Sequence, residues 1–301
     1  MVELVVISGK GGTGKTSIVA SFAALAEGSV VADCDFDAAD LHLLLRPGDT
    51  QAEDFSGGSL ARVDPERCYA CGQCKQLCRF GAVSLDGPGN KVVPRTYRVD
   101  PLACEGCGVC AWFCPGDAIE FGPVKTGACY VSETRFGAMA HAQLGVAAGN
   151  SGKLVTLVRS KARDLAKEAR VDLVIVDGPP GIGCPVIASL TGASFVLVVT
   201  EPTLSGQHDL KRVLSLAKHF KIPAAVCVNK WDVNPLLTVQ IEHDAEAAGA
   251  RVVGRVRYDP EVTVAQTQAE VAVERSSAAA VDIRGLWDKL REAGARRGVV
   301  F

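Results

Sequence analysis

The sequence has little of several features that mark large classes of protein. Aromatic residues make up only 6% of its 301 residues, so the stacking platforms of single-strand nucleic-acid binders are scarce. The formal net charge is −2, whereas proteins that coat nucleic acids are strongly basic. No apolar run reaches the roughly 18 residues of a membrane-spanning helix, and no secretion signal opens the chain. We therefore expect a cytoplasmic protein without a nucleic-acid partner.

Cysteine, in contrast, is abundant. The chain has 12 cysteines, and eight of them form two regular arrays between Cys68 and Cys114. Without an export signal we expect a reducing compartment, in which disulfides are rare. Regular cysteine arrays in such a protein indicate metal ligation.

Apolar runs and helical patterns alternate along most of the chain. Continuous apolar runs predict buried strands at residues 2–8, 29–35, 128–133, 171–177, 194–200, 223–229 and 252–256. Helical periodicity occupies residues 14–27, 154–169, 205–220, 234–248 and 279–292. This alternation predicts an α/β fold with a doubly wound, mostly parallel sheet. Residues 62–122 interrupt it, so we predict one α/β domain over 1–61 and 123–301 with a small inserted domain over 62–122.

A phosphate-binding loop follows the first predicted strand. Gly9–Thr16 matches G-x-x-x-x-G-K-[ST] between a strand and a helix. In this motif backbone amides and the helix N-terminus bind phosphates, the lysine meets the β/γ phosphates and the threonine hydroxyl meets Mg²⁺. Residues expected to hold the nucleotide are Gly11, Gly12, Thr13, Gly14, Lys15, Thr16 and Ser17.

Carboxylates follow two of the predicted strands. Asp33 and Asp35 end one strand, and Asp177 ends the apolar run VDLVIVD. A carboxylate at a strand end beside the phosphate loop can hold Mg²⁺ directly or through water. Asp37 and Asp40 equally fit turn formation and helix capping.

These motifs together resemble one family. KGGTGKT with its early lysine, DCD after the second strand and DGPPG resemble the deviant P-loop ATPases of the MinD/ParA group, over nearly all of the chain outside the insert. The resemblance implies that Lys10 reaches across a dimer interface to the partner's nucleotide, that Asp35 positions the attacking water, and that Asp177 serves Mg²⁺. Lys10, Lys15 and Asp35 are therefore the expected catalytic residues.

The base-binding region is less distinctive. Asn229-Lys230-x-Asp232 resembles the guanine-binding motif of GTPases, whereas in the MinD group an asparagine at this strand end contacts adenine. The deviant phosphate loop favours ATP over GTP. We expect Asn229 and Asp232 to contact the base and Tyr258 and Asp259 to close its pocket, although the latter pair equally fits an ordinary turn.

The predicted insert contains an internal repeat. VDPERCYACGQCKQLCRFGAV begins at Val63 and VDPLACEGCGVCAWFCPGDAI at Val99, an offset of 36 residues. Each copy has the C-x₂-C-x₂-C-x₃-C spacing of bacterial two-cluster ferredoxins, in which the fourth cysteine ligates the other cluster. One 4Fe-4S cluster is thus assigned to Cys68, Cys71, Cys74 and Cys114, and the second to Cys104, Cys107, Cys110 and Cys78. Zinc is the less favoured alternative, since its sites are usually paired CxxC knuckles.

Other positions bear on the clusters. Arg79 replaces the proline found after the fourth cysteine, and we expect this cation to raise the reduction potential of the nearer cluster.

Four cysteines lie outside the two arrays. Cys34 and Cys227 are expected to be packing residues. Cys184 follows Asp177 by seven residues. A cysteine at that offset in the nitrogenase iron protein ligates a cluster shared between subunits, so a redox role for Cys184, with Cys129 as its partner, stays open.

The combination resembles MinD-superfamily ATPases with an inserted ferredoxin domain, and GIGCPVIAS, TEPTLSGQHDL and VNKWD match that subgroup. This implies an ATPase that dimerises around nucleotide, as a homodimer or with a paralogue, and couples ATP to electron transfer or to assembly of a metallocofactor. The implied partners are a redox donor and a metallocofactor-bearing protein. The alternative is a MinD-like positioning ATPase with structural or redox-sensing clusters. Its membrane-seeking helix would be 279–292, for which packing on the sheet is favoured.

Overall fold

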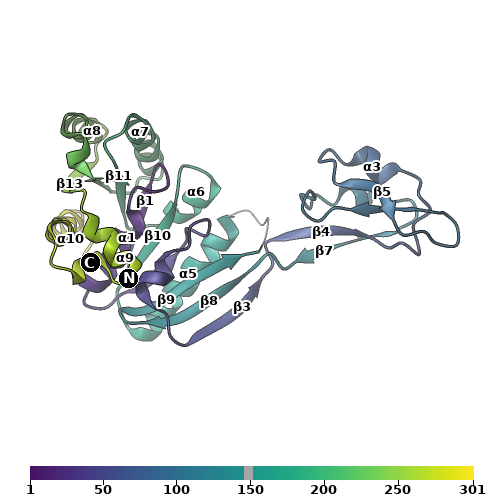
Figure 1. The fold of residues 1–301 in the computed structure, drawn as a ribbon, viewed down its shortest axis with the longest axis horizontal. Coiled ribbons are helices and arrows are strands. Elements are labelled where there is room, and N and C mark those ends of the chain that lie inside the picture. Colours follow the sequence, from purple (N-terminus) through teal and green to yellow (C-terminus); the bar gives the residue numbers. More distant parts are fainter. Residues whose placement is uncertain (146–151) are drawn as a thin grey trace. The chain divides into compact units, whose positions relative to one another are not determined.

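A long parallel sheet organises the larger part of the chain, and β1 (Val2–Ser8) lies near its middle. The computed structural model describes residues 1–145 and 152–301. The chain divides into two units (Figure 1). The larger contains Met1–Glu53, Cys129–Gln143 and the chain from Gly152 onward, and the smaller contains Asp54–Ala128.

The first elements of the chain are α1 (Lys15–Leu25), β2 (Val30–Asp33), α2 (Leu41–Leu45) and β3 (Thr50–Phe55). After the smaller unit come β8 (Gly127–Thr134), β9 (Gly137–Leu144), α5 (Gly152–Ala169), β10 (Leu173–Pro180), α6 (Cys184–Leu190), β11 (Phe195–Thr200) and α7 (Leu204–His219). The chain ends with β12 (Ala224–Asn229), η1 (Trp231–Val233), α8 (Pro235–Ala247), β13 (Arg251–Val256), α9 (Pro260–Thr267), η2 (Ala272–Glu274) and α10 (Ala278–Ala295).

Within the described residues, nine strands form one sheet in the order β13-β12-β11-β1-β10-β2-β9-β8-β3. The pairs from β13 to β9 are all parallel. The prediction of an α/β fold with a mostly parallel sheet is therefore confirmed. Parallel pairing also brings the carboxyl ends of β1, β2 and β10 to one edge, where the phosphate loop begins.

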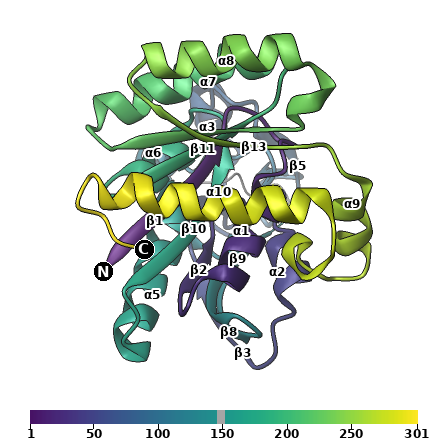
Figure 2. The same ribbon diagram turned by 90° about the vertical axis from the view of Figure 1, so that its left-hand side faces the viewer.

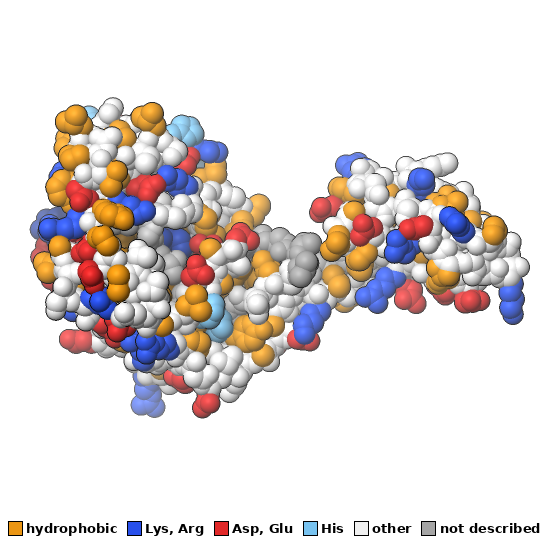
Figure 3. Space-filling model, viewed as in Figure 1, with side chains coloured by type: hydrophobic (Ala, Val, Ile, Leu, Met, Phe, Trp, Pro, Cys, Tyr) orange, Lys and Arg blue, Asp and Glu red, His pale blue; other side chains and the backbone are white. Residues whose placement is uncertain are grey.

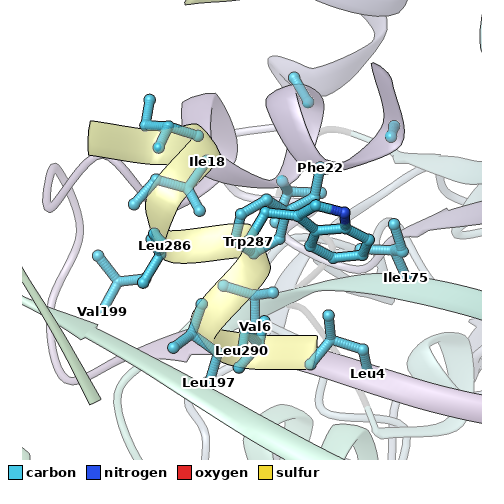
Figure 4. Packing of buried hydrophobic residues seen from close by; sticks show 14 of the residues in the cluster. Leu4, Val6, Ile18, Phe22, Ile175, Leu197, Val199, Leu286, Trp287 and Leu290 are labelled. Carbon is cyan, nitrogen blue, oxygen red and sulfur yellow. The ribbon is translucent and has the colours of Figure 1, made fainter. Parts of the chain in front are cut away.

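The sheet is covered by helices on both faces, which explains why its central strands are continuous apolar runs. Alternate residues of β1, such as Leu4 and Val6, pack with α1 and α10 in one buried cluster (Figures 2 and 4). Val5 and Ile7 are buried on the other face, where α6 and α7 contact the strands.

Helix α10 lies on the sheet. Ile283, Leu286, Trp287 and Leu290 are each at most 5% exposed, and the ring of Trp287 lies 4.8 Å from that of Phe22 (Figure 4). Burial against the sheet, favoured by the sequence over a membrane-seeking helix, is confirmed. No helix of the described chain is long and apolar enough to span a bilayer.

The smaller unit is built from two antiparallel strand pairs and two short helices. Its elements are β4 (Gly58–Val63), α3 (Gln73–Leu77), β5 (Val83–Gly87), β6 (Thr96–Val99), α4 (Val109–Trp112) and β7 (Ile119–Val124). β4 pairs with β7 and β5 with β6. A small core that includes Cys74, Val83 and Ile119 lies between them.

Two features differ from the sequence prediction. β3 and β9 extend the sheet although neither was predicted, because β3 is exposed except at Phe55 and β9 is rich in small residues with weak strand preference. The smaller unit is also longer than the predicted insert of 62–122. On the face shown in Figure 3, acidic and basic side chains are interspersed over both units.

Candidate nucleotide and metal sites

The phosphate loop joins β1 to α1 in the conformation that its glycines allow. Gly12 and Gly14 have φ of 77° and 84°, values that other residues rarely adopt. A Cβ at Gly14 would also lie 2.3 Å from Asn229 Nδ2. No side chain caps α1, so its first amides face the loop, the arrangement that binds phosphate in such loops.

Lys15 lies in a pocket of carboxylates. It is 5% exposed, its ammonium forms an ion pair with Asp177, and a second ion pair of 3.2 Å joins it to Asp35. Burial alone would lower the pKa of Lys15, but these carboxylates outweigh it and raise the pKa. Asp177 and Asp35, the two acidic residues expected to act beside Lys15, thus hold its ammonium in the charged form.

Three buried carboxylate oxygens around Lys15 lack a hydrogen-bond partner among the described residues. They are Oδ2 of Asp33, Oδ1 of Asp35 and Oδ2 of Asp177. Burial, together with the Asp177 carboxylate, raises the pKa of Asp33 well above its usual range, and burial also raises that of Asp35. Mg²⁺ is commonly bound by one or two carboxylates with phosphate and water oxygens. The unsatisfied oxygens therefore fit a magnesium ion delivered with a nucleotide.

Other predicted residues occupy the rim of this site. Thr13 and Ser17 are buried, Thr16 is half-buried, and Gly11 and Gly12 are exposed. Asp37 and Asp40 lie on the loop after β2 and are exposed, unlike the buried carboxylates of this site. Asp40 directly precedes α2.

Lys10 is held within its own chain. Its ammonium forms an ion pair with Glu201 and donates a 3.2 Å hydrogen bond to Thr203. Lys230 also approaches Glu201 at 3.3 Å and donates to the carbonyl of Gly12 at 3.2 Å. No local sequence pattern predicts this network, because Lys10 lies 193 residues before Thr203 in the chain.

A hollow beside the phosphate loop fits the expected base pocket. Asn229, Tyr258 and Asp259 line it together with Gly12 and Val262. The Asn229 side chain donates to the carbonyl of Thr13 at 2.7 Å, which ties the end of β12 to the loop. The pocket therefore joins the loop and the predicted base-contact residues Asn229 and Tyr258.

Asp232 and Asp259 have structural partners of their own. Asp232 accepts a 2.7 Å hydrogen bond from the amide of Tyr258 and is not among the lining residues of the hollow. Asp259 lines it, but its carboxylate accepts from the amides of Glu261 and Ala279 and so caps α9 and α10. Asp232 thus stabilises the turn at Tyr258 through one carboxylate oxygen, and its contact with the base stays a prediction.

The internal repeat of the smaller unit extends to its backbone. Ala70 and Gly106, 36 residues apart, have φ of 58° and 65°, and Gly72 and Gly108 have 85° and 74°. The amide of Asp64 donates to the carbonyl of Ala118, and that of Asp100 donates to the carbonyl of Ala82. The strand pair Val63–Ile119 likewise corresponds to Val99–Val83. The two halves are therefore related by a local pseudo-twofold axis.

Four cysteines line a single cavity in this unit. They are Cys68, Cys71, Cys74 and Cys114, the set assigned to the first cluster from the sequence. The amide of Ala118 donates to the Cys114 sulfur at 3.3 Å, and burial raises the pKa of Cys74 to about 11. Among residues 1–145 and 152–301, no three Cys, His, Asp or Glu side chains are arranged as ligands of a single metal ion. The four cysteines of the first predicted set thus line one cavity.

The second array lies at the corresponding place in the other half. Cys104, Cys107 and Cys110 interact electrostatically, and burial with these neighbours raises the pKa of Cys110. Cys78, Cys104 and Cys110 pack against the small core, and Arg79 after Cys78 is exposed.

The remaining cysteines are separate from these arrays. Cys34 and Cys227 are fully buried, as expected of packing residues. Cys129 is buried in β8, while Cys184 is exposed at the start of α6.

The chain is similar in sequence to known proteins. Residues 4–271 match the CobQ/CobB/MinD/ParA nucleotide binding domain. An uncharacterized protein of Methanocaldococcus jannaschii, MJ0578, is 31% identical over 238 residues, which cover 78% of this chain and 80% of that protein. A second from the same organism, MJ0579, is 26% identical over 78% of this chain and 82% of its own length.

Solved structures of MinD proteins are similar in fold. The cell division ATPase MinD of Pyrococcus furiosus is 15% identical, with a TM-score of 0.59 over 97% of this chain and 98% of its own. MinD of Pyrococcus horikoshii, complexed with Mg-ADP, is 13% identical, with a TM-score of 0.59 and 98% coverage of both chains. At these identities the likeness concerns the fold.

Proposed function

Because the chain belongs to the CobQ/CobB/MinD/ParA nucleotide-binding family, we propose that it is an ATPase that dimerises around its nucleotide and carries two 4Fe-4S clusters. The observation that carries this proposal is the cavity lined by Cys68, Cys71, Cys74 and Cys114. Those four residues come from both halves of the repeat, as the ferredoxin spacing requires.

The larger unit would bind and hydrolyse ATP. The phosphate loop and Lys15 hold the phosphates, and Thr16 and Asp177 serve Mg²⁺. Asp35 lies 3.2 Å from Lys15 Nζ and has one buried oxygen without a partner among the described residues. That oxygen is suited to orient a water molecule for attack on the γ-phosphate.

Dimerisation would depend on Lys10. To contact a partner's nucleotide it must leave Glu201 and Thr203, so the dimer forms only when the new contacts with phosphate exceed those lost. Shifting a population from 1:99 to 99:1 requires about 5.5 kcal/mol. Charge-assisted hydrogen bonds of roughly 1.5–3 kcal/mol each, formed symmetrically by both chains, are sufficient.

The smaller unit would serve electron transfer or the assembly of a metallocofactor. When bound, the clusters supply one-electron chemistry; the chain contributes thiolates, the Ala118 amide that donates to Cys114 and partial exclusion of water. Trp112 is 85% exposed and Phe113 57% exposed beside Cys114. Exposed aromatic residues are enriched at interfaces, which supports docking of a redox donor or of a metallocofactor-bearing protein here.

A second candidate is a positioning or regulatory ATPase with structural or redox-sensing clusters. The similarity in fold to MinD, a cell division ATPase, favours it. The two candidates differ in whether the clusters respond to nucleotide.

The test uses anaerobically purified full-length protein. Iron content, the EPR spectrum after dithionite reduction and the mass in solution are measured with ADP and with a non-hydrolysable ATP analogue. We expect eight irons per chain and two interacting signals that change as the dimer forms, since two 4Fe-4S clusters supply that number. Cys114→Ser should lose one cluster, whereas Cys184→Ser is the matched control and should retain both.

The first outcome below distinguishes the two candidates, and the other two test the clusters and the ATPase separately. Clusters whose signals ignore nucleotide while the mass doubles favour the positioning ATPase. Protein that binds ATP but incorporates no iron and sulfide would overturn the cluster assignment. Intact clusters without nucleotide binding would instead overturn the ATPase.

A further inference from the structure

A second hollow lies at the amino ends of the strands, whereas the phosphate loop lies at their carboxyl ends. It encloses about 400 Å³ where β11, β12 and β13 begin. Five basic side chains line it: Lys218, Lys221, Arg251, Arg296 and Arg297. Its floor includes Phe195, Ile222 and Ala293, which are buried.

These cations are unpaired. None of the five side chains forms a hydrogen bond or an ion pair with another described residue, and no acidic residue of the described chain lines the hollow. Several arginines elsewhere in the same unit are paired, as Arg255 is with Glu242 and Arg257 with Asp282. The hollow therefore gathers five positive charges without an acidic side chain among its described lining residues.

Helix termini explain only part of this charge. The C-terminal ends of α7, α8 and α10 lie at the hollow, and each helix end carries roughly −0.5 charge. Together they offset about 1.5 of the five positive charges. Lys221 and Arg251 also lie outside the helices, in the turn before β12 and at the start of β13.

We propose that this hollow binds a small organic anion with several negative charges, such as an organic polyphosphate. Arginine guanidinium groups bind phosphate or carboxylate in a planar, two-pronged manner. The apolar floor would accommodate the carbon skeleton, as in most ligand sites, where a few polar groups fix the orientation over an apolar surface. A hollow of about 400 Å³ can hold a discrete molecule, whereas a membrane surface is flat.

The experiment uses the full chain and a fluorescent probe, pyrene tetrasulfonate, which combines a flat apolar ring with four negative charges. Anisotropy should show saturable binding, and inorganic tripolyphosphate should compete with it. The double variant Arg251→Gln/Arg297→Gln should bind the probe at least tenfold more weakly, because two charge-assisted contacts are lost. Lys153→Gln/Lys289→Gln, which removes equal charge from exposed positions outside the hollow, should bind as the unmodified chain does.

Three results would overturn the proposal. The first is the absence of saturable probe binding at millimolar concentration. The second is an equal weakening in both double variants, which would indicate non-specific attraction by net charge. The third is binding to vesicles of anionic lipid, lost in Arg251→Gln/Arg297→Gln, without binding of the soluble probe, which would make the surface a membrane patch. Circular dichroism verifies that both variants fold.

Discussion

Asp33→Asn isolates the energetic cost of the buried carboxylates beside the phosphate loop. Asp33 is 1% exposed, and burial with the nearby Asp177 raises its pKa well above the usual range. Its Oδ1 accepts a 3.2 Å hydrogen bond from the amide of Asp35. Asparagine retains that acceptor and removes the charge, so the loop should keep its conformation.

The sign of the pH effect follows from proton binding. In the unfolded chain Asp33 loses its proton near pH 3.9, whereas the folded chain keeps it to higher pH. Between those values the unfolded state binds fewer protons, so the free energy of unfolding falls as pH rises. One proton contributes a slope of about 1.4 kcal/mol per pH unit. Asp33→Asn should remove this contribution and be the more stable protein at neutral pH without metal.

Urea unfolding from pH 4 to 8, without metal or nucleotide, measures the slope. Asp37→Asn is the matched control, because Asp37 is exposed on the same loop. In the unmodified chain, Mg–ADP should reduce the fall in the free energy of unfolding with rising pH. Mg–ADP should stabilise Asp33→Asn less than it stabilises the unmodified chain. Equal slopes for Asp33→Asn, Asp37→Asn and the unmodified chain would refute the reasoning.

Three further predictions concern the core, the dimer and the base. Trp287→Ala should lower the free energy of unfolding by about 3–5 kcal/mol in urea, as large core truncations do, whereas Val281→Ala, at an exposed position of the same helix, should change it by less than about 0.5 kcal/mol. Lys10→Gln should abolish the doubling of mass in solution with an ATP analogue, while the affinity of the monomer for nucleotide stays nearly unchanged. If the variant still dimerises normally, Lys10 does not bridge to the partner's nucleotide. Asp232→Asn should leave the ATP-to-GTP affinity ratio within twofold, because that carboxylate bonds to the Tyr258 amide; a large loss of GTP binding in calorimetry would restore a base contact.

The sequence predicts the central fold because its strands are buried on both faces. A continuous apolar run such as VELVVIS is typical of a strand that is buried on both faces. The strands β1, β10, β11, β12 and β13 all lie where such runs occur in the sequence. Edge strands give no such signal. In β3 only Phe55 is buried, so nothing in TQAEDF distinguishes it from a loop.

Groups of residues that a motif links could be predicted to lie together, whereas contacts between residues that no motif links could not. The phosphate loop and the first cysteine set are specified by spacing, and the structure brings each set together. The ion pair of Lys10 with Glu201 and the unpaired cluster around Arg251 depend on strand order and helix ends. Asp232 illustrates a further limit of prediction from motifs. The spacing of its motif does not specify whether its carboxylate contacts a nucleotide base or only a backbone amide.

The strand pairing of the smaller unit has a consequence for how each half can fold. β4 and β5 belong to the first half of the repeat and β6 and β7 to the second, yet β4 pairs with β7 and β5 with β6. A single half therefore cannot complete either pair from its own residues. A peptide containing one half alone is therefore expected to fold only by associating with an identical copy, which would supply the missing strand of each pair.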